Sequence, residues 1–331
     1  AIKVIAKIEN RQGVNNIDEI LKVSDGIMVA RGDLGVEIPV EEVPVVQKML
    51  IDKCQRYGKP VITATQMLDS MIRNPRPTRA EASDVANAIY DGTGAIMLSG
   101  ETASGKYPVE SVKTMARIAE TAENSIDYWK QFQNMKCDMV TSVTNAISHA
   151  TCTTAMDLNA AAIITVTQSG HTARMVSRFR PACPIIATTT SLKVQRQLNL
   201  SWGVKSFLVS ETYSTDEMFD MGVEKAREAG AANNGDIVVI TAGVPVGISG
   251  TTNILKVHTV GKVLVRGIGT NTGSFTGELC VVRTPEEAEE IFEEGKILVA
   301  PYTTNEMLNV MKKASAIIVE EHGTNVHASI V

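Results

Sequence analysis

Polar residues that could carry phosphate chemistry follow four short apolar runs in the first hundred residues. The polar segments are Lys7 to Asn10, Arg31 to Gly35, Thr63 to Gln66 and Leu98 to Glu101. Together they offer a cation, carboxylates and hydroxyls. Carboxylates hold hard divalent cations, and a lysine stabilises charge on a transferring phosphoryl group. These residue types therefore indicate phosphate and divalent-metal chemistry.

The apolar runs before these segments are predicted strands, and segments with helical periodicity separate them. The runs are Ile2 to Ala6, Ile27 to Ala30, Val61 to Ile62 and Ala95 to Leu98. In a parallel α/β array the carboxyl ends of the strands share one face, where ligands bind. The alternative is that Lys7 and Glu9 form a solvated ion pair and that Asp33 is a turn residue. Four polar strand ends in succession favour the site.

Composition sets the class of protein. A chain of 331 residues is long enough for two or three domains, and 44% hydrophobic with only 4% aromatic residues indicates aliphatic α/β cores. The net charge of -5 gives no reason to expect nucleic acid or a membrane as partner. No apolar run approaches the length needed to span a bilayer, and no basic-then-apolar leader is present.

The cysteines predict neither disulfides nor a zinc site, because they are odd in number and scattered without CxxC spacing. They are Cys54, Cys137, Cys152, Cys183 and Cys280. This usage fits a reducing, cytoplasmic compartment. The chain begins on Ala1 inside one apolar run and ends on Val331 inside another, so we expect it to be part of a longer polypeptide.

Helices between the strands are marked by their ends. Glu41 to Tyr57 has the apolar spacing of one helical face, with Gly58 as its stop. Thr78 to Glu81 is a capping-box pattern, and Pro108 begins a helix whose predicted apolar stripe contains Val109, Val112 and Met115. Four β/α units over residues 1–125 amount to half of a (β/α)8 barrel.

A second α/β series is predicted over residues 126–260, after a polar stretch at Asn124 to Met139. Its alternating strands and helices indicate an open, mostly parallel, doubly wound sheet. The predicted strands are Ala161 to Val166, Pro184 to Thr188, Lys205 to Val209, Asp236 to Thr241 and Ile254 to Val260. A glycine-rich stretch then leads into a partial third domain at 261–331, with strands at Ile297 to Ala300 and Ala316 to Val319.

The second series contains a candidate anion pocket. Thr167, Gln168, Ser169, Gly170, His171 and Thr172 lie between a strand and a helix N-terminus. Exposed N–H groups, hydroxyls and the helix dipole at such a place attract anions. A second loop, Gly243 to Asn253, also follows a strand and could close over the same anion. From pattern alone, plain turns are the open alternative for both loops.

Five linked motifs resemble the pyruvate kinase family, in order and at that family's spacing. They are Lys7 to Asn10, Ala30 to Gly35, Thr63 to Met71, Arg76 to Glu81 and Met97 to Ala103. The resemblance covers about residues 1 to 260. It implies the second half of the catalytic (β/α)8 barrel followed by an α/β effector domain. It also implies phosphoryl transfer from phosphoenolpyruvate to ADP, giving pyruvate and ATP in glycolysis.

The resemblance also implies site residues. Lys7 would stabilise the transferring phosphoryl group, and Glu9 and Asp33 would bind Mg²⁺ or Mn²⁺. The N–H groups of Gly32 and Asp33, with the Thr65 hydroxyl, would hold the substrate carboxylate. Ser99 and Glu101 would belong to the water-linked path that protonates the enolate.

In the same family the loop at Thr167 to Thr172 would bind a phosphate group, and the loop that includes Gly250 would close over a sugar-phosphate or nucleotide effector. Family members are tetramers, so we expect a homo-oligomer. The third domain is similar to phosphohistidine domains and aligns His327 with the phosphoacceptor. Because its flanking residues depart from that pattern, we expect no phosphotransfer through His327.

The resemblance places the K⁺ site, the substrate-binding arginine and the lid outside this chain. We therefore expect the isolated chain to be inactive as an enzyme. The competing hypothesis is a catalytically silent fragment that binds the effector and forms oligomers.

Overall fold

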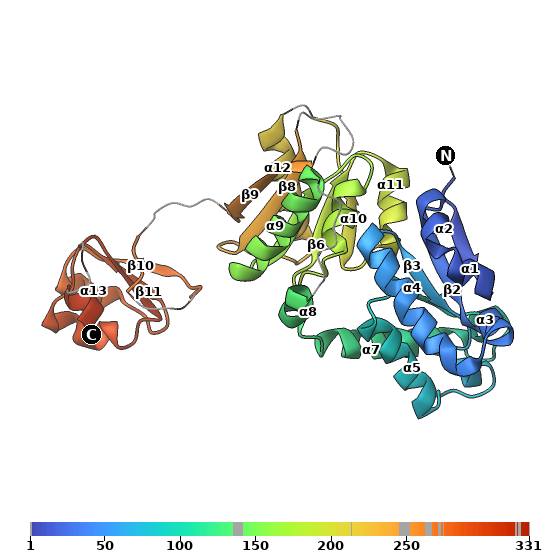
Figure 1. Ribbon diagram of the computed structural model, residues 1–331. Coiled ribbons are helices and arrows are strands. Elements are labelled where there is room, and N and C mark those ends of the chain that lie inside the picture. Colours follow the sequence, from blue (N-terminus) through green and yellow to red (C-terminus); the bar gives the residue numbers. More distant parts are fainter. Residues whose placement is uncertain are drawn as a thin grey trace. The chain divides into compact units, whose positions relative to one another are not determined.

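A computed structural model describes residues 2–134, 142–212, 214–244, 252–261, 267–270, 273, 275–321, 323 and 326–330. The chain forms two compact units, Ala1–Lys262 and Val263–Val331. The first unit contains a four-stranded and a five-stranded sheet, and the second contains a three-stranded sheet (Figure 1). In the part of the chain that is described, no helix is both long and apolar enough to cross a bilayer.

The four-stranded sheet is parallel, and its strands lie side by side in chain order. It comprises β1 (Ile5–Ile8), β2 (Gly26–Ala30), β3 (Val61–Ala64) and β4 (Ala95–Met97). All three strand pairs are parallel, with Ala30 opposite Ala64. Sequential parallel neighbours are the arrangement of a (β/α)8 barrel. The predicted α/β class and the four β/α units are therefore confirmed, and the sheet edges are β1 and β4.

Helices connect these strands and cover the sheet, and Figure 1 shows α4 lying across β2 and β3. The helical elements are α1 (Arg11–Asn15), α2 (Ile17–Val23), α3 (Arg31–Glu37), η1 (Val40–Glu42), α4 (Val43–Tyr57), η2 (Asp69–Ile72), α5 (Arg79–Tyr90), α6 (Gly100–Ala103) and α7 (Pro108–Asn124). Val46, Leu50 and Cys54 on α4 are buried in the core against β2 and β3. The helix ends at Gly58, whose φ of 63° is the left-handed conformation expected of a glycine stop.

The apolar face of α7 differs from its prediction. Val109 and Val112 are more than half exposed, whereas Met115 and Ala122 are buried. Met115 packs with buried residues of α5, such as Val85 and Ala88. The prediction is therefore confirmed at Met115 and wrong at Val109 and Val112, because the buried face of α7 runs through Ser111, Met115 and Ala122.

The capping box at the start of α5 is confirmed and makes part of the stability pH-dependent. Thr78 accepts from the Glu81 N–H, and the Glu81 carboxylate accepts from the Thr78 N–H. Burial by itself raises the pKa of Glu81, but hydrogen bonds from Ser70 and Thr78 outweigh it and hold that pKa below 4.5. A carboxylate with a depressed folded pKa stabilises the fold above its unfolded pKa, and this contribution is lost as pH falls through the folded pKa.

We therefore expect Glu81→Gln to lower the urea midpoint of unfolding at neutral pH. The difference from the unmodified chain should shrink as the pH falls below 4.5, where the native carboxylate also becomes protonated. Urea titrations of both proteins across the acidic range measure this. A difference that stays constant down to the pH of acid unfolding would contradict the assignment.

The five-stranded sheet has the order β7-β6-β5-β8-β9. Its strands are β5 (Ala162–Val166), β6 (Ile185–Thr189), β7 (Val204–Leu208), β8 (Ile237–Gly243) and β9 (Thr252–Thr259). All its pairs are parallel except β8 with β9, which is antiparallel. The open, mostly parallel sheet predicted for this region is thus confirmed, with an antiparallel strand at one edge.

Helices cover both faces of this sheet, as a doubly wound fold requires. They are α8 (Tyr128–Asn134), α9 (Val143–Asp157), α10 (His171–Ser177), α11 (Leu192–Gln197) with η3 (Leu198–Leu200), and α12 (Thr215–Glu228). Ile163 packs with α9 and α10 in one core, whereas its neighbour Ile164 packs with α12 in another. Successive strand residues point to opposite faces, so the two cores lie on opposite sides of the sheet.

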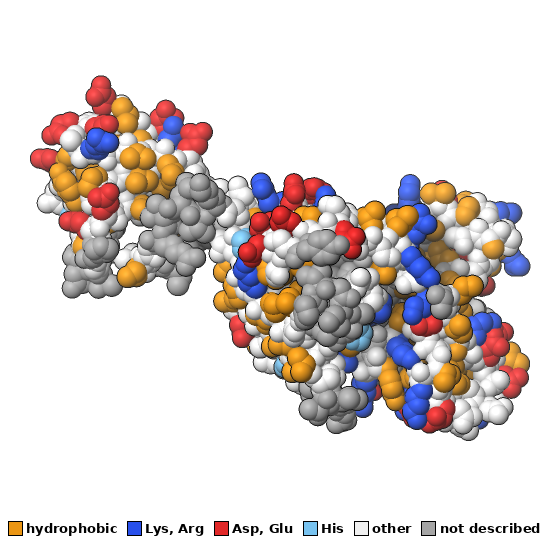
Figure 2. All heavy atoms as spheres, turned by 90° about the horizontal axis from the view of Figure 1, so that it is seen from above, with side chains coloured by type: hydrophobic (Ala, Val, Ile, Leu, Met, Phe, Trp, Pro, Cys, Tyr) orange, Lys and Arg blue, Asp and Glu red, His pale blue; other side chains and the backbone are white. Residues whose placement is uncertain are grey.

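The second unit is a small parallel α/β piece. Its elements are β10 (Leu279–Val281), α13 (Pro285–Ile291), β11 (Ile297–Ala300), η4 (Asn305–Met307), α14 (Leu308–Met311), β12 (Ala316–Val319) and α15 (His327–Ile330). The strand order is β10-β11-β12. Figure 2 shows acidic side chains gathered on this unit, where α13 contributes four glutamates (Figure 2). The predicted strands at 297–300 and 316–319 are confirmed.

Candidate functional site

The polar segments singled out in the sequence follow the carboxyl ends of the four parallel strands. Lys7 lies near the end of β1, and Asp33 lies in the first turn of α3, directly after β2. Thr65 follows β3, and Ser99 is the N-cap residue of α6, just beyond β4. Because the strands are parallel, all four positions belong to the same end of the sheet.

Lys7 is the centre of a charged cluster at this end of the sheet. Its Nζ contacts a carboxylate oxygen of Glu9 and lies 3.3 Å from Asp33 Oδ2. Hydrogen bonds to Glu9 and then to Asp33 raise the pKa of Lys7, so the ammonium stays charged at neutral pH. All three side chains are roughly half exposed. The cluster is therefore a charged group that a ligand in solution can reach.

Glu9 and Asp33 are of the residue type that could hold a divalent ion. They supply hard carboxylate oxygens, and Mg²⁺ sites typically combine one or two carboxylates with substrate phosphates and waters. Among the described residues, no group of three or more His, Cys, Asp or Glu side chains is arranged to hold a metal ion. An ion at this place would thus need oxygens from a substrate as well as these two carboxylates.

The proposed carboxylate-binding groups are brought together, but they bond to each other. The Gly32 N–H donates to Thr65 Oγ1 at 2.7 Å, and the Thr65 hydroxyl in turn donates to the Ala64 carbonyl at 2.7 Å. Thr65 and Gln66 have φ values of 70° and 53°, which are uncommon for residues with side chains. A loop held in this conformation places the Thr65 hydroxyl directly over the first turn of α3.

Arg31 holds the backbone after β3 in place, a role that the sequence motifs did not suggest. Its side chain is only 10% exposed, and one Nη donates to Asp84 Oδ1 at 2.7 Å. The other Nη donates to the Thr65 carbonyl at 2.7 Å, and Nε donates to the Ala64 carbonyl at 3.2 Å. Arg31 therefore fixes the unusual backbone after β3. The sequence feature that could have pointed to Arg31 is its position directly after a strand, next to Gly32 and Asp33.

Glu101 is buried, and its carboxylate accepts hydrogen bonds from two backbone N–H groups. It is 2% exposed. One carboxylate oxygen accepts from the Leu68 N–H at 3.0 Å, and the other accepts from the Ser99 N–H at 2.7 Å. It thereby joins the segment after β3 to the turn after β4 and orients Ser99. Ser99 itself is partly exposed, so of the two residues its hydroxyl is the one placed to meet a ligand.

The loop from Thr167 to Thr172 begins directly after β5 and enters α10. The Gly170 N–H donates to Thr167 Oγ1 at 2.9 Å, which closes the loop on itself. Gly170 has a φ of 78°, and a side-chain carbon there would lie 2.7 Å from an Arg174 nitrogen. Burial, with Arg174 and Arg178 nearby, lowers the pKa of His171, so this ring is mainly neutral at neutral pH. Gln168 is the exposed member of the loop, and Ser169 and His171 are partly exposed.

The described part of the second loop, Gly243 to Asn253, contacts the loop from Thr167 to Thr172. Thr172 and Thr252 share a hydrogen bond of 2.8 Å between their hydroxyls. Val244 and Asn253 are joined by two hydrogen bonds across the base of the loop. Gly250 lies outside the described residues.

His327 lies at the start of α15 in the second unit, with both ring nitrogens engaged. Nδ1 lies 2.9 Å from Thr303 Oγ1, and Nε2 lies 3.0 Å from Asn305 Oδ1. These partners fix the ring. The expectation that His327 carries no phosphoryl group stays a prediction.

Comparison with known proteins identifies the family. The sequence profile of the pyruvate kinase barrel domain matches residues 1–112, and that of the pyruvate kinase alpha/beta domain matches residues 145–258. The chain belongs to the pyruvate kinase family. A third profile, the mobile domain of PEP-utilising enzymes, matches residues 292–331.

Curated pyruvate kinases match over the full chain. The pyruvate kinase of Geobacillus stearothermophilus is 54% identical over 330 residues, and that of Sporosarcina psychrophila is 53% identical over the same length. In both cases the match covers 100% of this chain and 56% of the relative. The chain thus spans a little over half the length of these pyruvate kinases.

A solved pyruvate kinase shares the fold. The crystal structure of a pyruvate kinase from Cryptosporidium parvum superimposes with a TM-score of 0.74 at 43% sequence identity. The match covers 78% of this chain and 52% of that chain. The four-stranded parallel sheet followed by a doubly wound α/β sheet is therefore a fold that this chain shares with a solved member of the family.

Proposed function

We propose that the protein containing this chain is a pyruvate kinase, which transfers the phosphoryl group of phosphoenolpyruvate to ADP and yields pyruvate and ATP. The observation that carries the proposal is the Lys7–Glu9–Asp33 cluster at the carboxyl end of the four-stranded sheet. It occurs in a chain 54% identical to a named pyruvate kinase. The reaction belongs to glycolysis, and a cytoplasmic location follows from that assignment.

In this mechanism the residues act mainly by positioning charge. The bond between the enol oxygen and phosphorus breaks as a bond from an ADP oxygen to phosphorus forms. A loose phosphoryl transition state spreads negative charge over its oxygens, and the Lys7 ammonium neutralises part of it. Glu9 and Asp33 would hold Mg²⁺ or Mn²⁺, which supplies positive charge to the phosphate and enolate oxygens. K⁺ is expected by family, with its site outside this chain.

Substrate binding and protonation involve the remaining residues. The N–H groups of Gly32 and Asp33, with the Thr65 hydroxyl, bind the substrate carboxylate, which requires the Gly32–Thr65 hydrogen bond to give way to the ligand. Ser99 lies on the path that delivers a proton to the enolate carbon. Glu101 supports that path by holding the Ser99 N–H at 2.7 Å.

A coupled assay for pyruvate formation tests the proposal. We expect no turnover from these 331 residues alone, because the chain spans 56% of its relatives' length. We expect turnover when the chain replaces its counterpart in the Geobacillus stearothermophilus enzyme. A folded chimera without activity would overturn the proposed function. Easily measured turnover by the isolated chain would overturn the view that it is incomplete as an enzyme.

The second candidate function, a catalytically silent fragment that binds an effector and forms oligomers, is favoured by the same partial coverage. We propose an effector site for a sugar phosphate or nucleotide at Thr167 to Thr172 in either case. Support comes from the loop's place at the end of β5 and from its link to Thr252. Calorimetric titration with ribose 5-phosphate, AMP and fructose 1,6-bisphosphate tests it. Absence of binding by all three, with activation unchanged in a Ser169→Ala enzyme, would exclude the site.

We also propose that the isolated chain forms homo-oligomers. Strands β1 and β4 are edges of the four-stranded sheet within the described residues, and an unpaired edge invites pairing with another chain. Light scattering measures the state directly, and a monodisperse monomer would count against the proposal. No nucleic-acid or membrane partner is proposed.

A further inference from the structure

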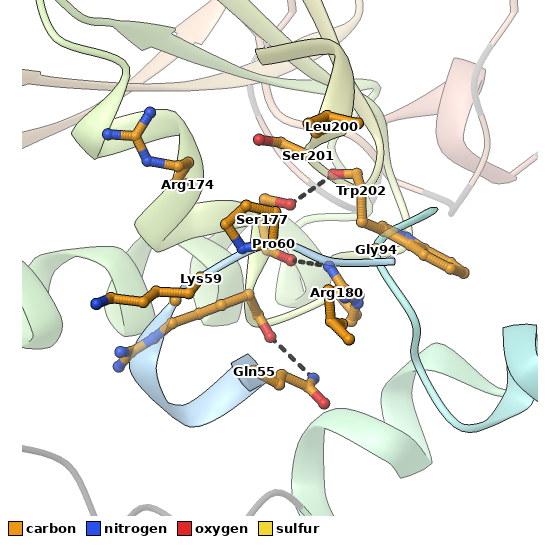
Figure 3. A pocket seen from close by; sticks show the side chains of 13 residues that line it. Gln55, Lys59, Pro60, Gly94, Arg174, Ser177, Arg180, Leu200, Ser201 and Trp202 are labelled. Atoms are coloured by element: carbon orange, nitrogen blue, oxygen red, sulfur yellow. Dashed lines mark hydrogen bonds between the residues drawn. The ribbon is translucent and has the colours of Figure 1, made fainter. Parts of the chain in front are cut away.

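A cavity lies inside the first unit where the four-stranded and five-stranded sheets meet. Its volume is about 30 Å³, which is room for about two waters, and its mouth opens to solvent. Residues from the region of α4 and β3 and residues from α10 both line the cavity. The lining residues are Gln55, Gly58, Lys59, Pro60, Val61, Gly94, Arg174, Ser177, Arg178, Arg180, Leu200, Ser201 and Trp202 (Figure 3).

All the charged residues that line this cavity are basic. Four of its members are basic, namely Lys59, Arg174, Arg178 and Arg180, and none is acidic. Arg180 is only 6% exposed. Charged residues so deeply buried are normally paired with an opposite charge. Within the described residues, Lys59, Arg174 and Arg180 form no ion pair with a carboxylate.

Neutral carbonyl groups satisfy most of the donors instead. Arg180 donates to the carbonyls of Ser177 at 3.0 Å and Gly92 at 2.7 Å, and Lys59 Nζ donates to the Ser24 carbonyl at 2.6 Å. Glu123 acts on Arg180, and Asp25 acts on Lys59 and Arg174, only through space and without an ion pair. Burial lowers the pKa of Arg180 to about 10.

One buried donor in the cavity wall has no partner. Arg180 Nε is buried and makes no hydrogen bond in the structure. The guanidinium lies 4.7 Å from the centre of the Trp202 ring, which fixes its plane. Figure 3 shows Arg180 between Trp202 and Lys59, with the Ser201 hydroxyl turned toward the Arg174 side of the cavity. A buried N–H without an acceptor is costly, and an acceptor in the cavity would remove that cost.

We propose that this junction cavity binds a small oxyanion of the phosphate class. Such an anion brings net negative charge and several acceptor oxygens, which are what the lining lacks, and arginines favour these oxygens. Bound there, it would tie the end of α4 and the start of β3 to α10. The site is distinct from the loop at Thr167 to Thr172, although Arg174 touches both, because its Nη2 donates to the Ser169 carbonyl at 3.3 Å.

Titration of the full chain with inorganic phosphate at constant ionic strength tests this proposal. Because a ligand bound only to the native state raises the unfolding temperature, we expect a rise of about 2–3 °C at ten times Kd. Calorimetry should give two binding events, one in the cavity and one at the loop. Chloride at equal ionic strength is the control and should produce no comparable rise.

Two matched variants decide which site is responsible. Ser201→Asp places a carboxylate in the cavity, so it should abolish one binding event and raise the unfolding temperature in phosphate-free buffer. Ser201→Asn should retain both events. Ser169→Asp should abolish only the loop event. If Ser201→Asp does not fold, Leu200→Glu makes the same test at the rim, where Leu200 is 38% exposed.

Two results would overturn the proposal that the cavity binds an anion. Failure of phosphate to bind the unmodified chain would overturn the proposal. So would a phosphate response that Ser169→Asp abolishes completely while Ser201→Asp leaves it intact, since the anion would then occupy the loop alone. Neither result bears on phosphoryl transfer at Lys7, which the pyruvate assay measures separately.

Discussion

Replacing Lys7 with methionine is expected to lower kcat by about 1,000-fold in the Geobacillus chimera, with a much smaller change in KM for phosphoenolpyruvate. Removing a preorganised charge stabiliser typically costs a factor of this size. The effect falls on kcat because the ammonium interacts more strongly with the charge distribution of the transition state than with that of the bound substrate. Methionine keeps the length of the side chain while removing its charge. Steady-state assays of pyruvate formation measure both parameters.

Two controls separate catalysis from the ion pairs that Lys7 makes with Glu9 and Asp33. Lys7→Arg retains the charge with altered geometry and should recover part of the lost rate. Lys3→Met removes a lysine on the same segment whose partner is Asp25, 2.7 Å away, and should leave kcat unchanged. A Lys7→Met enzyme with kcat within tenfold of the unmodified chimera would show that this ammonium does not stabilise the transferring group.

Much of the fold could be predicted because local chemistry determined it. Gly58 ends α4 in the left-handed conformation, and Thr78 and Glu81 form the predicted capping box. These signals depend on neighbours within a few residues. The placement of Lys7 and Asp33 at one end of the sheet was also predictable, since parallel strands bring their carboxyl ends together.

What could not be predicted depends on partners distant in sequence. The Gly32 N–H and the Thr65 hydroxyl were expected to face a ligand side by side, yet they bond to each other across 33 positions. Glu101 was expected in a proton path, and its burial against the Leu68 N–H became visible only in three dimensions. The exposure of Val109 similarly depends on which face of α7 meets α5. No local pattern contains this information.

The cationic junction cavity shows the same limit. Arg178 and Arg180 occur two positions apart in a segment with no sequence motif of its own. Arg178 and Arg180 donate hydrogen bonds to the backbone carbonyls of Arg56 and Gly92, respectively, which lie about 90 to 120 positions away in the sequence. A charge count along the chain treats these arginines as ordinary surface residues. Their burial, and the gathering of Arg180 with Lys59 and Arg174 at one cavity, become visible only in three dimensions.

Arg31→Met is expected to lower the free energy of unfolding by about 2–4 kcal/mol, because it removes an ion pair and two hydrogen bonds to partly buried groups. Asp84 would lose its cation, and the carbonyls of Ala64 and Thr65 would each lose a donor. The positive φ of Thr65 would then have less to hold it, so kcat/KM in the chimera should fall as well. Urea unfolding and steady-state kinetics measure the two effects.

The control for this prediction is Arg117→Met. Arg117 makes a 3.0 Å hydrogen bond to Thr114 on the exposed side of α7, and its loss should change stability by no more than about 0.5 kcal/mol. Arg31→Lys should give an intermediate loss, because an ammonium cannot reach Asp84 and both carbonyls in the fork geometry of a guanidinium. If Arg31→Met and Arg117→Met cost the same, Arg31 does not position the segment after β3. Thr65 must then be held by its hydroxyl contacts with Gly32 and Ala64 alone.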